Sequence, residues 1–333
     1  MLALGSLLAI TTLMASGCAK TPTRAGIDPT QEGQRTLTRY RFARVMMGSR
    51  CEITLEATNE PEAAQAVGRA FDEIKRIERV LSDYDAESES MRIMELQPGI
   101  DHQISETLLE VLLVSGDIHA ASGGAFDPTI GALTHLWRNS AREGEIPSQE
   151  SIDNARDRIG FEHVQIDLDT HTLIFDQTGM ILDFGGIGKG YAAQKAVELL
   201  TNLGYPVACV NLGGDLHLGE APSNQPEGWR IEIVTGLGRT QTLHLKHCGI
   251  ATSGDLERYY EHQGVRYSHI IDPRTGMGIT QRRAATVIAP DATIADALAS
   301  ANSVMGERGK DQLEQAYPDA SIVLVSRALE ADD

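Results

Sequence analysis

The sequence is short of positive charge. Its 333 residues include 29 Lys and Arg against 47 Asp and Glu, which gives a formal net charge of -18. Nucleic acid and anionic lipid both attract clustered Lys and Arg, so neither is expected to bind the folded chain through its overall field. An anionic ligand would therefore be held locally, by backbone N–H groups, a metal ion or a small basic patch.

Cysteine is also scarce, and the four cysteines lack the spacing of the common metal sites. Cys51, Cys209 and Cys248 lie in apolar or strand-like segments, and the chain contains no Cys-x-x-Cys pair. We expect these three residues to be small buried hydrophobic side chains. The sequence does not predict a zinc site.

Long apolar runs are missing apart from one at the N-terminus, so no transmembrane helix is predicted elsewhere. Residues 1–17 contain no charged residue and are rich in Leu, Ala and Ile, which is typical of a secretory signal. The run ends in the sequence ASGC at residues 15–18, which resembles a bacterial lipobox. We predict a signal peptide over 1–17, followed by a lipid-bearing Cys18 and a polar tether over 18–36.

The lipobox predicts an exported protein that is lipid-anchored to a bacterial membrane, on its periplasmic face. Two or more acyl chains would anchor it stably. Ala19, rather than Asp, follows the cysteine, which favours the outer membrane where the host has one. The start of the chain lacks the usual Lys/Arg region, so a plain secretory signal and a translation start further upstream are alternatives.

Residues 37–330 are predicted to form one domain of the α+β class, because hairpins and helices do not alternate as regular βαβ units. After Pro61, apolar residues recur at intervals of three and four and predict a helix. Its expected buried face consists of Val67, Phe71, Ile74, Ile77 and Leu81. The other predicted elements are hairpins over 40–56 and 164–175, strands over 207–212, 229–235, 243–247, 285–289 and 321–325, and helices after Ser105, over 191–203 and over 293–305.

A glycine-rich loop follows a short predicted strand, 181–183, and opens the helix over 191–203. Its sequence is DFGGIGKG, at residues 183–190. Glycines let a ligand approach the backbone closely, and a helix N-terminus offers unpaired N–H groups to phosphate. The spacing is neither the dinucleotide fingerprint nor a Walker A loop, which needs Ser or Thr directly after its Lys. A tight strand-to-helix turn without a ligand is the alternative.

Asp296 and Ser300 are four residues apart in a predicted helix, so both side chains lie on one face. A carboxylate and a hydroxyl oxygen placed in this way can share a hard cation such as Mg²⁺, with water and phosphate oxygens completing the octahedron. The alternative is an Asp on the helix surface with a Ser that packs inward.

The segment 251–276 combines small, charged and apolar residues with one histidine, His269, which precedes Ile270 and Ile271. A core strand does not need this histidine, and a solvated loop does not need the isoleucines. We predict a binding wall that ends in a catalytic or ligand-orienting group. Two earlier motifs, at 81–84 and 122–129, offer Tyr84 to stack on a flat ring and Phe126 and Asp127 to hold a ring edge. An ordinary half-buried Tyr and a capping Asp are the alternatives.

Taken together and in order, these motifs resemble the ApbE family of FAD:protein FMN transferases, from about Arg44 to Val325. The resemblance implies an ApbE-like, T-fold-related α+β domain, with FAD as substrate and Mg²⁺ as cofactor. It also implies transfer of FMN to a Thr or Ser hydroxyl of a partner protein, with release of AMP. The partner is expected to carry an Asp-x-x-Thr/Ser type motif and to serve electron transfer. The motifs that carry the resemblance are at residues 47–49, 81–84, 87–89, 124–129, 136–137, 183–191, 211–215, 251–276 and 295–300.

The family resemblance also implies a site. His269 would take the proton from the acceptor hydroxyl or orient that group, or would instead bind a flavin phosphate. Mg²⁺ would be held by the carbonyl of Gly188 together with Asp296 and Ser300. The residues implied to contact the flavin substrate are Met47, Tyr84, Ala125, Phe126, Asp127, Asp183, Gly185, Lys189, Tyr191, Thr252, Ser253, Gly254 and Ile271.

The chain departs from the family pattern at three positions. Met94 stands where Asn is usual, Ser300 stands where Thr is usual, and Gln194 stands where Asp is common. Met94 removes a polar contact to flavin, and Ser has a freer χ1 than Thr, which loosens metal binding. Two alternatives therefore stay open, a Mg²⁺-dependent FAD pyrophosphatase that releases FMN and AMP, and a non-catalytic flavin-binding lipoprotein.

Overall fold

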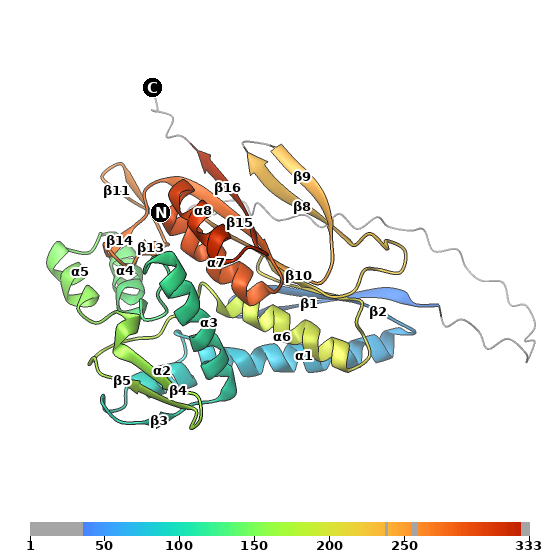
Figure 1. The fold of residues 1–333 in the computed structure, drawn as a ribbon, viewed down its shortest axis with the longest axis horizontal. Helices are drawn as coiled ribbons and strands as arrows, with labels where there is room; N and C mark the ends of the chain where they lie inside the picture. Colours follow the sequence, from blue (N-terminus) through green and yellow to red (C-terminus); the bar gives the residue numbers. More distant parts are fainter. Residues whose placement is uncertain (1–35, 237–238, 255–258, 328–333) are drawn as a thin grey trace, which may run out of the picture.

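The computed structural model describes residues 36–236, 239–254 and 259–327. Its centre is a seven-stranded sheet in which every neighbouring pair is antiparallel (Figure 1). The strands follow one another across the sheet in the order β1 (Thr38–Met46), β2 (Ser49–Ala57), β6 (Ala208–Leu212), β7 (Asp215–Leu218), β10 (Cys248–Gly254), β15 (Arg282–Ala289) and β16 (Ser321–Arg327).

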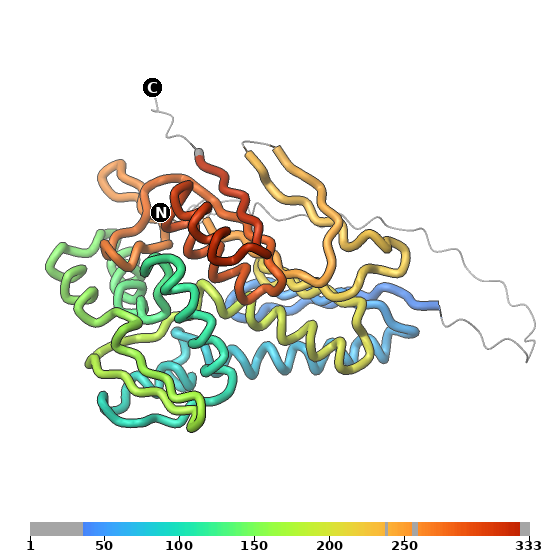
Figure 2. Tube along the Cα trace, viewed as in Figure 1, coloured from blue at the N-terminus to red at the C-terminus, as the bar shows by residue number. Residues whose placement is uncertain are grey.

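Three helices cover one face of this sheet. They are α1 (Glu60–Leu81), α6 (Gly188–Asn202) and α7 (Ala292–Met305), with α6 packed between the other two. Two further helices, α3 (Glu106–Ser122) and α8 (Glu307–Ala316), pack against α7. Figure 2 shows the red C-terminal helices lying against green α3, which occurs much earlier in the chain. Burial of apolar side chains between helices and sheet supplies the main stabilisation.

A two-stranded hairpin, β8 (Trp229–Gly236) with β9 (Arg239–Leu245), packs on the other side of the sheet. Its Trp229, Ile231 and Ile233 share a core cluster with Leu216 and Leu218 of β7. Residues 215 and 217 alternate with these leucines, so Asp215 points to the helix-covered face. This alternation decides which side of β7 takes part in the site.

The remaining elements form a region beside the helices, at the left of Figure 1. This region contains helices α2, α4 and α5, a three-stranded sheet of order β3-β5-β4, and two small hairpins, β11–β12 and β13–β14. The indole of Trp137 in α4 donates a hydrogen bond of 2.8 Å to the carbonyl of Gly276 in the β13–β14 turn. The elements are α2 (Glu89–Met94), α4 (Gly131–Glu143), α5 (Gln149–Arg156), β3 (His102–Gln103), β4 (Val164–Asp167), β5 (Thr172–Phe175), β11 (Tyr259–His262), β12 (Val265–Ser268), β13 (Ile271–Asp272) and β14 (Met277–Gly278).

Most predicted elements of the described segments are confirmed. Helix α1 begins where Asn59 accepts a hydrogen bond from the N–H of Glu62, and all five of its predicted core positions are buried. The two predicted hairpins are β1–β2 and β4–β5. The three cysteines in the described part of the chain are buried and free, as expected. The α+β class is also confirmed.

One predicted strand and two predicted boundaries were wrong. Residues 181–183 form no strand, because only Ile181 makes an isolated bridge, to Ile130, before the chain turns into the glycine loop. Helix α6 starts at Gly188 rather than at residue 191. Strand β9 ends at Leu245, because His247 has a left-handed φ of 50° that no strand accommodates.

Helices α2, α4, α5 and α8 and hairpins β11–β12 and β13–β14 were missed by the sequence prediction. Their segments are short or rich in polar residues and carry little periodicity. Among the described residues, no helix is both long and apolar enough to cross a membrane. The predicted signal and the tether up to residue 35 lie outside the described residues, so that prediction stands untested.

Candidate active site

The glycine-rich loop leads into the first turn of α6, where several predicted motifs converge. A Cβ placed on Gly188 would lie 3.6 Å from Met47 Cε and 3.6 Å from Leu81 Cδ1. These residues come from the β1–β2 turn and the end of α1. A Cβ on Gly213 would lie 2.9 Å from Ser49 Oγ and 3.7 Å from Lys189 Cδ. The motifs at 47–49, 183–190 and 211–215 therefore meet at the N-terminus of α6.

Asp296 of α7 is the buried carboxylate at this helix start. Its Oδ2 accepts a hydrogen bond of 2.9 Å from the N–H of Gly190, and Lys189 forms an ion pair with the buried Asp215. Burial, followed by the negative charge of Asp215, raises the pKa of Asp296 to about 7, although Lys189 and the Gly190 N–H act in the opposite direction. Two buried carboxylates and one ammonium group thus share this corner, which leaves it with excess negative charge.

Ser300 lies one helical turn after Asp296 and faces the same loop. A Cβ on Gly186 would lie 2.8 Å from Ser300 Oγ and 3.3 Å from a ring carbon of Phe126. The absence of a side chain at Gly186 therefore lets the loop pass close to both residues. The structure brings Asp296, Ser300 and Phe126 to the loop that contains Gly188, as the family resemblance implied.

The end of β10 is tied to the neighbouring strand and helix. Thr252 Oγ1 and Thr286 Oγ1 of β15 are 2.9 Å apart, and Ser303 of α7 donates a hydrogen bond of 2.8 Å to the carbonyl of Ser253. A Cβ on Gly254 would lie 2.7 Å from Ala284 Cβ. The strand end that holds Thr252, Ser253 and Gly254 therefore packs against α7. Its contact residue, Ser303, is three residues beyond Ser300.

A second cluster surrounds Arg138, which sequence reasoning missed. The guanidinium of this α4 residue lies 2.5 Å from Asp83 Oδ2 and 3.1 Å from Asp183 Oδ2. Thr134 Oγ1, one turn earlier, donates to Asp183 Oδ2 at 2.7 Å, and the N–H of Gly185 donates to Asp183 Oδ1 at 2.8 Å. The spacing of Thr134 and Arg138 by four residues beside the Leu136-Trp137 motif was the available signal, but α4 itself was not predicted.

The surroundings of this cluster shift the pKa values of its two carboxyl groups in opposite directions. Burial, and then the charge of Asp83, raises the pKa of Asp183 above its usual value, against the effect of Arg138 and of hydrogen bonds from Thr134 and Gly185. Burial would also raise the pKa of Asp83, but hydrogen bonds and charges from His135 and Arg138 outweigh it and lower that pKa. Tyr84 lies at the rim, with its ring centroid 4.4 Å from the Arg138 guanidinium carbon and 75% of its surface exposed.

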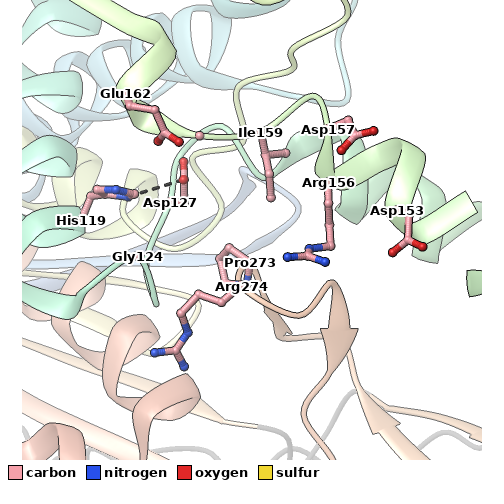
Figure 3. A pocket seen from close by; sticks show the side chains of 11 residues that line it. His119, Gly124, Asp127, Asp153, Arg156, Asp157, Ile159, Glu162, Pro273 and Arg274 are labelled. Carbon is pink, nitrogen blue, oxygen red and sulfur yellow. Dashed lines mark ion pairs between the residues drawn. The ribbon is translucent and has the colours of Figure 1, made fainter.

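The loop after α3 borders a polar cavity of about 450 Å³ (Figure 3). Asp127 lies at its wall, where Oδ1 accepts hydrogen bonds from the N–H and hydroxyl of Thr129, at 2.8 and 2.6 Å. Oδ2 of Asp127 lies 3.4 Å from His119 Nδ1, and burial raises the pKa of this carboxyl group. Figure 3 shows Asp127 and Glu162 on one side of the cavity and the guanidinium groups of Arg156 and Arg274 on the other.

Four other predicted residues lie in different surroundings. The hydroxyl of Tyr191 donates to Glu110 of α3 at 2.7 Å, so the ring packs between helices and does not face the glycine loop. Ile271 is buried in a core cluster with Trp137. His269 is exposed, in the bend between β12 and β13. Ala125 is buried at the turn before Phe126.

The departures from the family pattern also have a place in the structure. Met94 is buried in the main hydrophobic core. The side-chain carbonyl of Gln194 accepts a hydrogen bond of 2.6 Å from Thr293, so this α6 residue joins the start of α7. Across residues 36–236, 239–254 and 259–327, no three His, Cys, Asp or Glu side chains are grouped to hold a metal ion. Any cation site here would have to mix carboxylate, hydroxyl and backbone oxygens.

Comparison with solved structures defines the class of fold. The flavin transferase ApbE from Vibrio cholerae is 26% identical and superposes with a TM-score of 0.78, over 89% of this chain and 96% of that one. The FAD:protein FMN transferases of Treponema pallidum and Escherichia coli K12 are each 30% identical. The first match covers 88% of this chain and 86% of the relative, and the second covers 80% and 78%.

The ApbE family profile matches residues 47–324. The chain therefore belongs to the ApbE family, as its motifs indicated.

Proposed function

We propose that the protein is an FAD:protein FMN transferase that moves the FMN moiety of FAD to a Thr or Ser hydroxyl of a partner protein and releases AMP. The convergence of four separated segments on the first turn of α6 carries this proposal. In the reaction, the acceptor oxygen forms a bond to the FMN phosphorus while the bond between that phosphorus and the bridging oxygen breaks. AMP leaves with the bridging oxygen, and the acceptor hydroxyl loses its proton. Such chemistry depends mainly on positioning and charge neutralisation.

The residues at α6 fit a Mg²⁺ ion as cofactor. Asp296 Oδ2 accepts the Gly190 N–H, the same carboxylate could bind a cation, and the nearby Ser300 supplies a hydroxyl. Mg²⁺ commonly uses one or two carboxylates and takes its other ligands from water and substrate phosphates. The buried negative charge of Asp215 and Asp296 favours a cation at this corner. Bound there with the Gly188 carbonyl, Mg²⁺ would neutralise pyrophosphate charge.

The chain's own residues would order the rest of the substrate. Lys189 and the glycines of the loop would border the phosphates, and Phe126, Asp127 and Tyr84 would hold the rings. His269 is exposed between two hairpins, where an acceptor side chain can reach it. It would take the acceptor proton, since an imidazole accepts protons near neutral pH.

The direct test of this function uses the purified protein, FAD, Mg²⁺ and an acceptor protein with an Asp-x-x-Thr motif. We expect a denaturing gel to show a fluorescent flavin band at the acceptor. Asp296→Ala should reduce the labelling rate by roughly 100-fold or more, because it removes the buried metal carboxylate. Asp311→Ala, an exposed α8 residue, is the matched control and should label normally. Undiminished labelling by Asp296→Ala would remove the metal assignment.

The pyrophosphatase alternative uses the same residues, with water in place of the acceptor hydroxyl. It predicts AMP release at the full rate when no acceptor is present. The transferase predicts AMP release that depends on acceptor concentration. Stoichiometric FAD binding without AMP release over hours would instead favour the non-catalytic alternative.

We also propose that the protein is exported and held at a bacterial membrane through lipid on Cys18. The lipobox-like sequence at residues 15–18 supports this localisation. The acceptor would then be a protein with a domain exposed on the same side of that membrane.

A further inference from the structure

We propose that Arg138 is a positioning residue for the flavin substrate, which holds the Tyr84 ring and the Asp183 carboxylate in their binding arrangement. The inference rests on the proposed function, because it assigns Tyr84 and Asp183 to FAD. It adds a residue that lies outside every motif of the family resemblance. Three contacts of one guanidinium group, with Asp83, Asp183 and Tyr84, carry it.

The guanidinium bridges two segments that are far apart in the sequence. One nitrogen, Nη1, contacts Asp83 in the loop after α1, at 2.5 Å, and Nη2 contacts Asp183 in the loop before α6, at 3.1 Å. Both carboxylates are buried, whereas the Arg138 side chain is 24% exposed. A planar fork with donors in fixed directions can join two carboxylates in a defined geometry, which a lysine cannot do.

The same guanidinium supports Tyr84. The guanidinium carbon lies 4.4 Å from the centroid of the Tyr84 ring, which is the distance of a cation–π contact. The ring is 75% exposed, so most of its surface can receive a planar ligand. An exposed aromatic ring normally samples several rotamers, and a contact on one face limits that freedom before a ligand arrives.

Arg138 also screens the two carboxylates from each other. The charge of Asp83 acts on Asp183 and raises its pKa, while Arg138 acts on both groups in the opposite direction. Asp183 Oδ2 keeps a second donor in Thr134, and its Oδ1 holds the N–H of Gly185. Loss of Arg138 would leave Asp83 without its closest cation and would remove the ion pairs that join the Tyr84 loop to the glycine loop.

The test measures FAD binding and turnover in the purified protein with three variants. Arg138→Leu should weaken FAD binding by roughly tenfold or more and raise the KM for FAD, because the ring and carboxylate are no longer held in place. At saturating FAD, kcat should stay within about threefold of the wild type, since Arg138 does not touch the reacting phosphorus. Arg138→Lys should recover only part of the affinity. Arg142→Leu, on the exposed face of α4, is the matched control.

A double-mutant cycle separates positioning from a general structural role. In a Tyr84→Leu background, Arg138→Leu should cost less FAD affinity than it does in the wild type, because the supported ring is already gone. Equal costs in both backgrounds overturn the proposal. So does a folded Arg138→Leu or Arg138→Lys variant that binds FAD like the wild type, or one that loses kcat with an unchanged KM.

The FAD-binding measurement needs no acceptor protein. It can therefore test the role of Arg138 independently of the transferase function. If the wild type binds FAD but labels no acceptor, the transferase function fails while the FAD affinities still decide the role of Arg138. If the wild type does not bind FAD, both fall together.

Discussion

The Asp296 carboxylate caps the start of α6. It does so while buried and close to the negative charge of Asp215. The cap is the hydrogen bond of 2.9 Å from the Gly190 N–H. Burying the charged form of this carboxyl group costs free energy, so the pKa of Asp296 rises to about 7. A cation bound beside Asp296 would offset this cost, so the folded protein should be more stable with the cation than without it.

This raised pKa predicts how stability depends on pH. The folded pKa of about 7 exceeds the ordinary value of 3.8, so the folded state holds a proton that the unfolded state loses. Metal-free protein should therefore lose stability as the pH rises from about 4 through 7. Asp296→Asn keeps the capping oxygen and removes the titration, so it should be more stable than the wild type at pH 8, by on the order of 2 to 4 kcal/mol.

Urea unfolding in EDTA between pH 4 and 8 measures this difference. The advantage of Asp296→Asn should be largest at pH 8 and should disappear near pH 4. A constant difference across the range, or a less stable variant at pH 8, would contradict the assigned burial. Asp311→Asn, at an exposed position of α8, controls for the effect of net charge.

At the scale of elements, the close approach of α6 and α7 depends on one glycine. A Cβ on Gly190 would lie 2.1 Å from the carbonyl oxygen of Ala292 and 2.7 Å from Asp296 Cβ. No side chain fits there without moving a helix. The same contact sets the distance between the glycine loop and Asp296, so packing and site geometry have one origin.

Gly190→Ala should therefore destabilise the protein by roughly 1 to 3 kcal/mol, since it forces two helices apart. Gly68→Ala is the matched control, because Gly68 lies in α1 with nothing within 4 Å of the added Cβ. That control should stabilise the protein by about 0.5 to 1 kcal/mol through helix propensity. Thermal unfolding of both variants checks the pair, and similar effects in both would refute the packing account.

Elements with strong periodicity could be predicted from the sequence, and the others could not. Helix α1 carries apolar residues at every third or fourth position, and its predicted face is buried. Helix α4 has a mixed composition, and its burial depends on contacts such as that of Trp137 with Gly276, far along the chain. Because Arg138 and Thr134 belong to α4, the cluster around them was missed with it.

In the site, too, local spacing was predictable and contacts between distant segments were not. Helix spacing predicted that Asp296 and Ser300 share one face, and the family resemblance implied that Gly188 lies beside them. The orientation of Tyr191 was not predictable, since the partner of its hydroxyl, Glu110, lies on a different helix. Pairings between distant segments are set by tertiary packing, which local spacing does not encode.

At the scale of the whole molecule, the proposed membrane attachment depends on lipid at Cys18, the last residue of the lipobox-like sequence. Replacing Cys18 with Ser should move the protein from the membrane fraction to the soluble fraction of a bacterial host and abolish incorporation of labelled fatty acid. Two acyl chains or more would anchor the protein stably, and the substitution removes the thiol that would carry lipid. Cys51→Ser is the matched control, because that thiol is buried in the sheet. Membrane retention of Cys18→Ser would contradict the lipid anchor.

The excess of negative charge bears on the choice of partner. With a formal charge of -18, the protein repels acidic surfaces at long range, although a local basic group such as Arg156 can still attract a carboxylate. Recognition of an acceptor would then depend on contacts near the site rather than on steering by the overall field.

One measurement tests the central claim most directly. Wild-type protein, FAD and Mg²⁺ are incubated with an acceptor protein, and intact-mass spectrometry of the acceptor is paired with quantification of AMP. The account predicts an acceptor mass increase equal to one FMN less one water, with one AMP released for each modified acceptor, and loss of the modification when the acceptor Thr is replaced by Ala. AMP and free FMN formed at the same rate without any modified acceptor would contradict it.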